Sequence, residues 1–97
     1  MRNYRRVRRD YPKGVIGIYD NKGKTIDRYT VVYEPSLDRN GQEYFPYLGM
    51  SEFPFHPQGF GQHGETDSRY TRQNGEIVIN FYDLPNDCRR AVLQDLA

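Results

Sequence analysis

Two stretches near the start of the chain have the pattern of β-strands joined by a turn. Residues 15–19 (VIGIY) are almost entirely apolar, and residues 25–34 (TIDRYTVVYE) are rich in β-branched and aromatic residues, which favour strands. A period of two places Tyr29, Val31 and Tyr33 on one face of the second strand. Residues 20–23 (DNKG) have the composition of a turn. The pattern therefore predicts an antiparallel hairpin.

Two further strands are predicted later in the chain. Residues 43–49 (EYFPYLG) form one candidate, and Pro46 predicts that it lies at a sheet edge or carries a bulge, because proline cannot donate to a ladder. Residues 76–82 (EIVINFY) form the other and follow an Asn-Gly turn signal. The apolar side chains expected on one face of this strand are Ile77, Ile79 and Phe81.

The C-terminal segment has the pattern of an amphipathic helix. Pro85 suits the first helical position. Helical spacing over residues 85–96 brings small or apolar side chains to one face: Cys88, Ala91, Val92 and Leu96. The whole pattern predicts one small α+β domain over residues 14–97, with an antiparallel sheet of about four strands, one C-terminal helix and a long ordered loop.

The long loop is expected over residues 50–73 and holds both histidines of the chain. A connection of this length in a compact domain is either functional or unstructured, and its phenylalanines indicate that part of it packs in an ordered way. We therefore expect a binding surface at residues 53–65 and neighbouring tyrosines. The residues expected to contact a partner are Tyr47, Phe55, His56, Phe60, Gln62 and His63.

Charge is unevenly distributed, although the formal net charge is only +1. Residues 1–13 form a basic arm with six basic side chains against one acid. One interpretation is nucleic-acid binding, in which arginines neutralise phosphates and Tyr4 and Tyr11 stack on bases. The other is a solvated terminal segment. The arginines of the candidate nucleic-acid interface are Arg2, Arg5, Arg6, Arg8 and Arg9.

Tyrosine is the most abundant aromatic residue, with nine in the chain. Strands with tyrosine on both faces cannot bury every ring in a small core. One hypothesis is a stacking platform for single-stranded nucleic acid or a protein-binding patch, formed by Tyr29, Tyr33, Tyr44 and Tyr47. The alternative is that these rings cover the core with their hydroxyls in water.

A divalent-metal enzyme is a further alternative. His56, His63 and Glu65 are metal-ligand types, although the spacing H-x6-H-x-E matches no compact ligand motif. We favour histidines that act locally or contact a partner, so we expect no cofactor and a non-enzymatic protein. Cys88 falls on the inward face of the predicted helix, which indicates a core residue rather than a nucleophile.

The single cysteine favours a reducing compartment, because it cannot form an internal disulfide. No apolar run approaches the length of about 18 residues that spans a membrane. No apolar segment follows the basic N-terminus, as it would in a secretory signal. We therefore expect a cytoplasmic protein with no membrane contact.

Three segments together resemble a family of small uncharacterised proteins of bacteria, their phages and plasmids. They are residues 19–32 (YDNKGKTIDRYTVV), 47–65 (YLGMSEFPFHPQGFGQHGE) and 83–96 (DLPNDCRRAVLQDL). The resemblance carries over no catalytic residue. It implies a mobile-element protein that binds a host protein or nucleoprotein, for example as an inhibitor of a defence system. A homodimer is a further expectation, through a free strand edge at residues 44–49.

Overall fold

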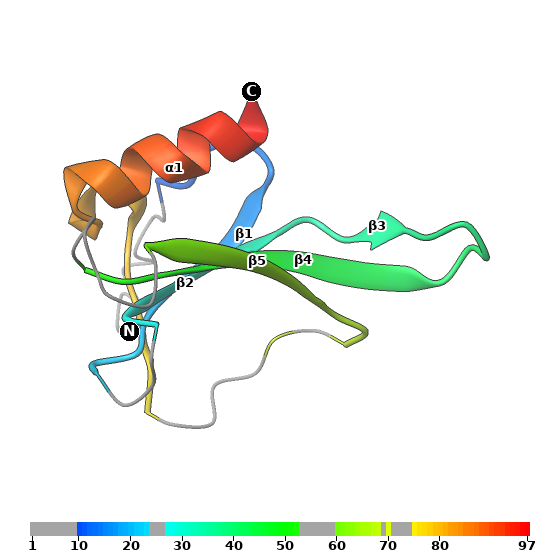
Figure 1. The fold of residues 1–97 in the computed structure, drawn as a ribbon, viewed down its shortest axis with the longest axis horizontal. Helices are drawn as coiled ribbons and strands as arrows, with labels where there is room; N and C mark the ends of the chain where they lie inside the picture. The colour runs from blue at the N-terminus through cyan, green and yellow to red at the C-terminus, as the bar shows by residue number, and fades with distance from the viewer. Residues whose placement is uncertain (1–9, 24–26, 53–59, 69, 71–74) are drawn as a thin grey trace, which may run out of the picture.

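The computed structural model describes residues 10–23, 27–52, 60–68, 70 and 75–97. Its strands are β1 (Val15–Asp20), β2 (Tyr29–Tyr33), β3 (Ser36–Leu37), β4 (Glu43–Met50), β5 (Gly61–Thr66) and β6 (Ile77–Val78). The 3-10 turn η1 (Phe81–Asp83) leads into helix α1 (Asn86–Leu96), as Figure 1 shows. The sheet runs β6–β1–β2–β4, and both β3 and β5 pair with β4. The predicted α+β fold is confirmed, with six strands among the described residues rather than about four.

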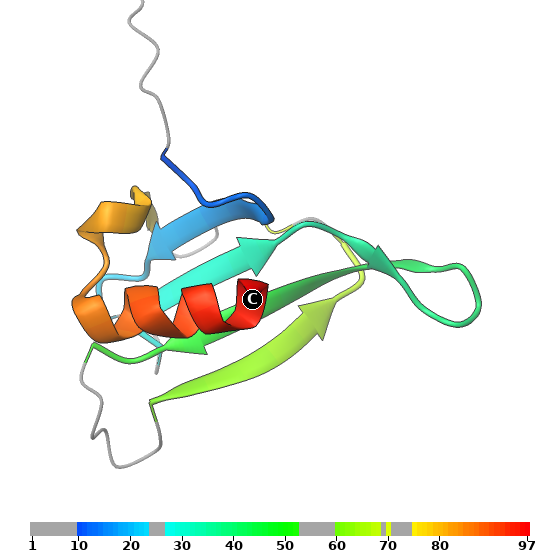
Figure 2. The same cartoon turned by 90° about the horizontal axis from the view of Figure 1, so that it is seen from above.

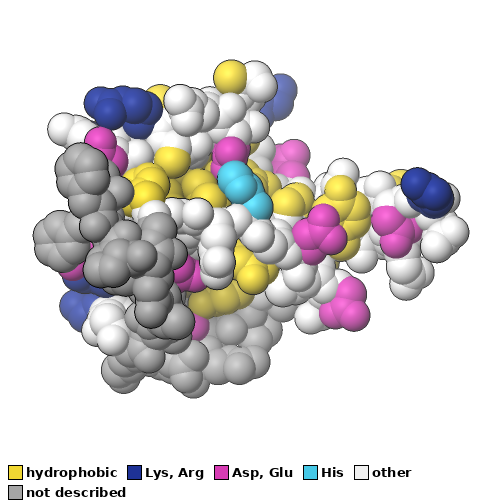
Figure 3. Space-filling model, viewed as in Figure 1, with side chains coloured by type: hydrophobic (Ala, Val, Ile, Leu, Met, Phe, Trp, Pro, Cys, Tyr) yellow, Lys and Arg dark blue, Asp and Glu magenta, His cyan; other side chains and the backbone are white. Residues whose placement is uncertain are grey.

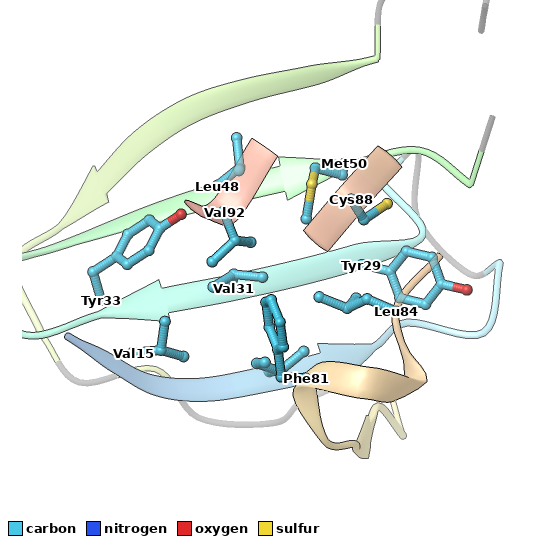
Figure 4. Packing of buried hydrophobic residues seen from close by; sticks show 11 residues of the cluster. Val15, Tyr29, Val31, Tyr33, Leu48, Met50, Phe81, Leu84, Cys88 and Val92 are labelled. Atoms are coloured by element: carbon cyan, nitrogen blue, oxygen red, sulfur yellow. The ribbon is translucent and has the colours of Figure 1, made fainter. Parts of the chain in front are cut away.

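Helix α1 packs across one face of the sheet and closes the core. Its predicted inward residues Cys88 and Val92 are fully buried and lie over the central strands (Figure 4). The buried side chains of the sheet on this face are Val15, Ile18, Tyr29, Val31, Tyr33, Leu48 and Met50. Removal of this apolar surface from water stabilises the fold. Among the described residues, no helix has the length and apolar character needed to cross a membrane.

The predicted hairpin of β1 and β2 is present, with Tyr19 opposite Thr30 and Asp20 opposite Tyr29. Its turn end is tied by Arg28, which donates two hydrogen bonds to the Asp20 carboxylate at 2.7 and 3.2 Å. A third bond of 2.8 Å joins Arg28 to Glu52, just beyond the end of β4. One guanidinium therefore connects three segments of the chain.

Strand β4 lies inside the sheet, so the edge alternative predicted for residues 43–49 is wrong. It pairs with β2 and β3 on one side and with β5 on the other. The Ser51 N–H donates to the Phe60 carbonyl. Along an antiparallel ladder every second residue is hydrogen-bonded to the same neighbour, so the odd-numbered residues of β4 bond to β5 and the backbone groups of Pro46 face away from it. Pro46 lies between the β2–β4 ladder, which ends with Val32 opposite Tyr47, and the β3–β4 ladder, which begins with Ser36 opposite Tyr44. The register shifts by one residue between these two ladders, and a residue without an N–H is tolerated there. The free edge that we expected at residues 44–49 for a homodimer is therefore not present.

Residues 61–66, in the middle of the expected long loop, form strand β5. It pairs with β4 over its whole length, from Gly61 opposite Met50 to Thr66 opposite Phe45. The preceding part of the loop, residues 53–59, lies outside the described residues. The sequence of β5, GQHGET, has none of the β-branched or aromatic alternation that identifies a strand, so the pairing is imposed by β4.

The predicted strand at residues 76–82 is shorter than expected. β6 has two residues and pairs with the end of β1, after which Phe81 begins η1 and enters the core. Ile77 is 45% exposed and Glu76 only 6%, so the predicted apolar face containing Ile77 is wrong. The Tyr70 hydroxyl donates a 2.6 Å bond to the Glu76 carboxylate, which satisfies this buried acid.

Tyr11 belongs to the segment expected to be a basic arm, and it packs against the core. Its hydroxyl donates to the Ile79 carbonyl at 3.2 Å. The ring is therefore a structural contact, and the prediction that Tyr11 stacks on bases is wrong.

Candidate functional site

Strand β5 is an edge strand with exposed backbone groups. The Ser51–Phe60 hydrogen bond sets the alternation, so even-numbered residues of β5 direct their backbone groups to β4. Gly61, His63 and Glu65 direct theirs to the other side. Within the described part of the chain, no strand pairs with that side. The edge therefore presents three N–H and three C=O groups in an extended row.

A groove lies between β5 and the helix. Figure 2 shows α1 over the middle of the sheet, with β5 beyond it at the edge. The groove has a volume of about 290 Å³. Its apolar part is formed by Leu48 and Met50 of β4, by Ala91 of α1, and by the half-buried Phe60, which immediately precedes β5. The full lining of this β5 groove is Leu48, Met50, Phe60, Gly61, His63, Ala91, Gln94 and Asp95.

His63 and Asp95 join the edge strand to the last turn of α1. The His63 Nε2 lies 2.8 and 3.0 Å from the two carboxylate oxygens of Asp95, so this nitrogen carries a proton and donates. Tyr33 of β2 donates a further bond to Asp95 at 2.7 Å. Burial and this hydrogen bond raise the pKa of Tyr33 above its ordinary range. Asp95 therefore accepts hydrogen bonds from side chains of two strands, β2 and β5.

An acidic hollow lies at the opposite end of β5, beside the β3–β4 hairpin. Its volume is about 650 Å³. Four carboxylates line it, and no basic residue is among its described neighbours. The residues of this acidic hollow are Asp38, Gln42, Glu43, Tyr44, Glu65, Thr66, Asp67 and Ser68. Figure 3 shows hydrophobic side chains beside the histidine and acidic side chains toward the hairpin.

The structure separates the residues expected to form one binding surface. Phe60 and His63 both line the β5 groove. Gln62 is exposed on the other face of β5, because it alternates with His63. Tyr47 is opposite Gly64, and its ring occupies the space that a side chain at Gly64 would need. Phe55 and His56 lie outside the described residues.

The four-tyrosine platform is not formed. Tyr29 and Tyr33 are 6% and 9% exposed and belong to the core under α1, because a period of two turns them inward with Val31. Only Tyr44 and Tyr47 are partly exposed. Cys88, in contrast, is the buried core residue that the helical pattern predicts.

The metal and nucleic-acid hypotheses rest partly on residues outside the described part. His63 and Glu65 lie two residues apart on β5, but His56 is not described. Among the described residues, no group of three or more histidine, cysteine or acidic side chains could hold a metal ion. The arginines of the basic arm, residues 2–9, are also not described. The metal set and the nucleic-acid interface stay predictions.

The sequence did not indicate Asp95, Ala91, Leu48 or Met50 as parts of a site. One signal for Asp95 was present in the sequence. An acid in the last turn of a helix faces the negative end of the helix dipole, so hydrogen-bond donors from other elements would stabilise Asp95 there. The position of α1 beside β5 depends on how the helix packs on the sheet, and no local sequence pattern indicates it.

Comparisons of the chain with protein-family models, with curated proteins and with solved structures find no match. The resemblance to proteins of phages and plasmids therefore stays a prediction.

Proposed function

We propose that this chain is a binding protein that adds an extended segment of a partner protein to the edge of β5. The open row of backbone groups at Gly61, His63 and Glu65 carries the proposal. In β-strand addition, main-chain hydrogen bonds provide affinity, and pockets for alternate side chains provide specificity. The β5 groove supplies such a pocket directly beside the edge.

The composition of β5 supports this role. Natural sheets protect free edges with charged side chains, above all lysine, with proline, with bulges or with very short strands. β5 has six residues, GQHGET, without proline or lysine, and its register with β4 is continuous. An edge with a single acidic side chain, Glu65, and without proline, lysine or a bulge is suited to pairing with another chain. A host protein or nucleoprotein, as the resemblance implies, is the class of partner that we propose.

Replacement of Glu65 by proline tests the edge. Glu65→Pro removes one outward N–H and leaves the hydrogen bonds between β5 and β4 in place. Proline is tolerated at such a position, where the N–H of an edge strand faces away from the sheet. Glu65→Ala is the matched control, because it removes the same side chain and keeps the N–H. Each variant of the full chain, immobilised at equal density, is used to capture partners from host extract, with folding checked by thermal melting.

The proposal expects proteins that bind the alanine variant and are lost or strongly reduced with the proline variant. Amide exchange on a purified complex should then show protection of Gly61, His63 and Glu65. Equal capture by the two folded variants, or unchanged exchange at these amides, would overturn strand addition at β5.

A further inference from the structure

The two ends of the β5 edge have opposite chemical character. At Gly61 the edge adjoins the apolar part of the β5 groove, lined by Met50, Phe60 and Ala91. At Glu65 it adjoins the acidic hollow. A strand that pairs along β5 would cross both, because each hollow contains a residue of β5 whose backbone faces outward.

Strand geometry fixes the spacing of the side chains that would meet these two hollows. Gly61 and Glu65 pair with Met50 and Pro46 of β4. Even-numbered residues of β4 share one face, and this face carries the core residues Leu48 and Met50. Gly61 and Glu65 therefore lie on the face of the sheet that α1 covers. Residues directly opposite them in an added strand share this face. They are four positions apart whichever way the partner strand runs, roughly 13 Å.

At the first position, Gly61 leaves the groove accessible from the edge. A side chain there would point at Met50 and Leu48, with its Cβ 3.3 Å and 3.5 Å from their nearest atoms. With glycine in place, a side chain from the partner can reach over the strand into the groove. Leu48, Met50, Phe60 and Ala91 favour an apolar group.

At the second position, the local charge selects a cation. Asp38, Glu43 and Asp67 join Glu65 around the acidic hollow, and none of the described residues that line it is basic. The carboxylates of Glu65 and Asp67 are exposed, so a lysine or arginine can reach them without burial of an unpaired charge. Opposite charges directly across two strands attract, whereas like charges repel.

We propose that the partner segment is an extended strand with an apolar and a basic side chain four residues apart. The apolar side chain enters the β5 groove beside Gly61, and the basic one meets Glu65 at the acidic hollow. This inference rests on the proposed strand addition and specifies its ligand. Main-chain bonding holds any extended segment, and these two side chains select among segments.

Selection from a displayed library of random nine-residue peptides on the full chain tests the inference. Peptides that bind both the wild type and Glu65→Ala, and not Glu65→Pro, are taken as edge-dependent, synthesised and titrated by fluorescence polarisation. We expect an apolar residue and a lysine or arginine four positions apart in these peptides. Exchange of the basic residue for glutamate should weaken binding by about two- to fivefold, and Glu65→Lys should reverse this preference.

Ala91→Leu tests the groove independently. Leucine is favourable in a helix and would fill the groove from α1. We expect about tenfold or greater weakening for peptides with a large apolar residue at the first position, and no such loss when alanine replaces that residue in the peptide. Thermal melting verifies that the variant is folded.

Three results would overturn the inference, and they have different meanings. Edge-dependent peptides without the four-residue pattern would refute the ligand and leave strand addition in place. Absence of any edge-dependent peptide would refute both. Dimerisation of the wild type in sedimentation, lost with Glu65→Pro, would show that the occupant of the edge is a second copy of this chain.

Discussion

The Tyr33 hydroxyl donates a 2.7 Å hydrogen bond to Asp95 and so fastens the last turn of α1 to β2. Tyr33 lies in the core, whereas the other donor to Asp95, His63, has 65% of its side chain exposed. The two bonds to one carboxylate therefore form in different surroundings. A hydrogen bond in water contributes little, and loss of one in the core leaves a polar group without a partner.

Substitutions at the three residues should differ in their cost. Asp95→Ala leaves the buried Tyr33 hydroxyl without its acceptor, and we expect a loss of about 1–3 kcal/mol in the free energy of unfolding. His63→Ala should cost less than about 1 kcal/mol. Urea denaturation measures both. In a double-mutant cycle, Tyr33→Phe should recover part of the Asp95→Ala loss, and equal costs for Asp95→Ala and His63→Ala would contradict this assignment.

Backbone amides of β5 should alternate in their exchange with solvent. Gln62, Gly64 and Thr66 face β4 and should be protected, whereas the outward amides of Gly61, His63 and Glu65 should exchange rapidly. Hydrogen exchange followed by NMR on the isolated protein measures each amide. Protection of all six would mean that the edge is already occupied in the free protein, and uniform rapid exchange would mean that β5 is not paired with β4.

The parts of this fold that the sequence predicts have a local residue pattern, whereas the other parts depend on contacts between distant segments. The β1–β2 hairpin and α1 are visible in the sequence because each has a local pattern, as at Tyr29, Val31 and Tyr33 for the strand. Strand β5 has no such pattern, because glycine and polar residues pair along an existing neighbour. His63 could be singled out by residue type, but its contact with Asp95 depends on how α1 crosses the sheet.

Acid should weaken the anchor between Asp20 and Arg28. The Arg28 hydrogen bonds hold the pKa of the Asp20 carboxyl below its ordinary value of 3.8. A lowered pKa in the folded state gives stability above the ordinary value, and that stability is lost as pH falls through the lowered one. The advantage of the wild type over Asp20→Asn should therefore be constant near neutral pH and shrink below about pH 4.

Urea denaturation at several pH values between 2 and 7 gives this difference directly. Glu34→Gln is a suitable control, because it makes the same carboxylate-to-amide change at an exposed residue. A constant gap between the wild type and Asp20→Asn down to pH 2 would show that the ion pair does not lower the pKa of Asp20.

Cys88 should behave as an inert thiol in the folded protein. It has no exposed surface, its Sγ lies 3.5 Å from the Ser51 carbonyl oxygen, and burial raises its pKa from 9.0 to about 11. Since a thiolate is the reactive form, labelling at pH 8 requires the helix to open. We expect labelling at least about 100-fold slower than in the denatured chain.

A second helix position supplies the matched control. Leu93 is 51% exposed on the same helix, so the variant Cys88→Ala with Leu93→Cys should label rapidly under the same conditions. The raised pKa also has a consequence for stability. Its contribution is complete below the ordinary pKa of 9.0 and is lost as pH rises through about 11, so the folded protein should become less stable over this window. Rapid labelling of native Cys88 at pH 8 would show that α1 does not close the core as described.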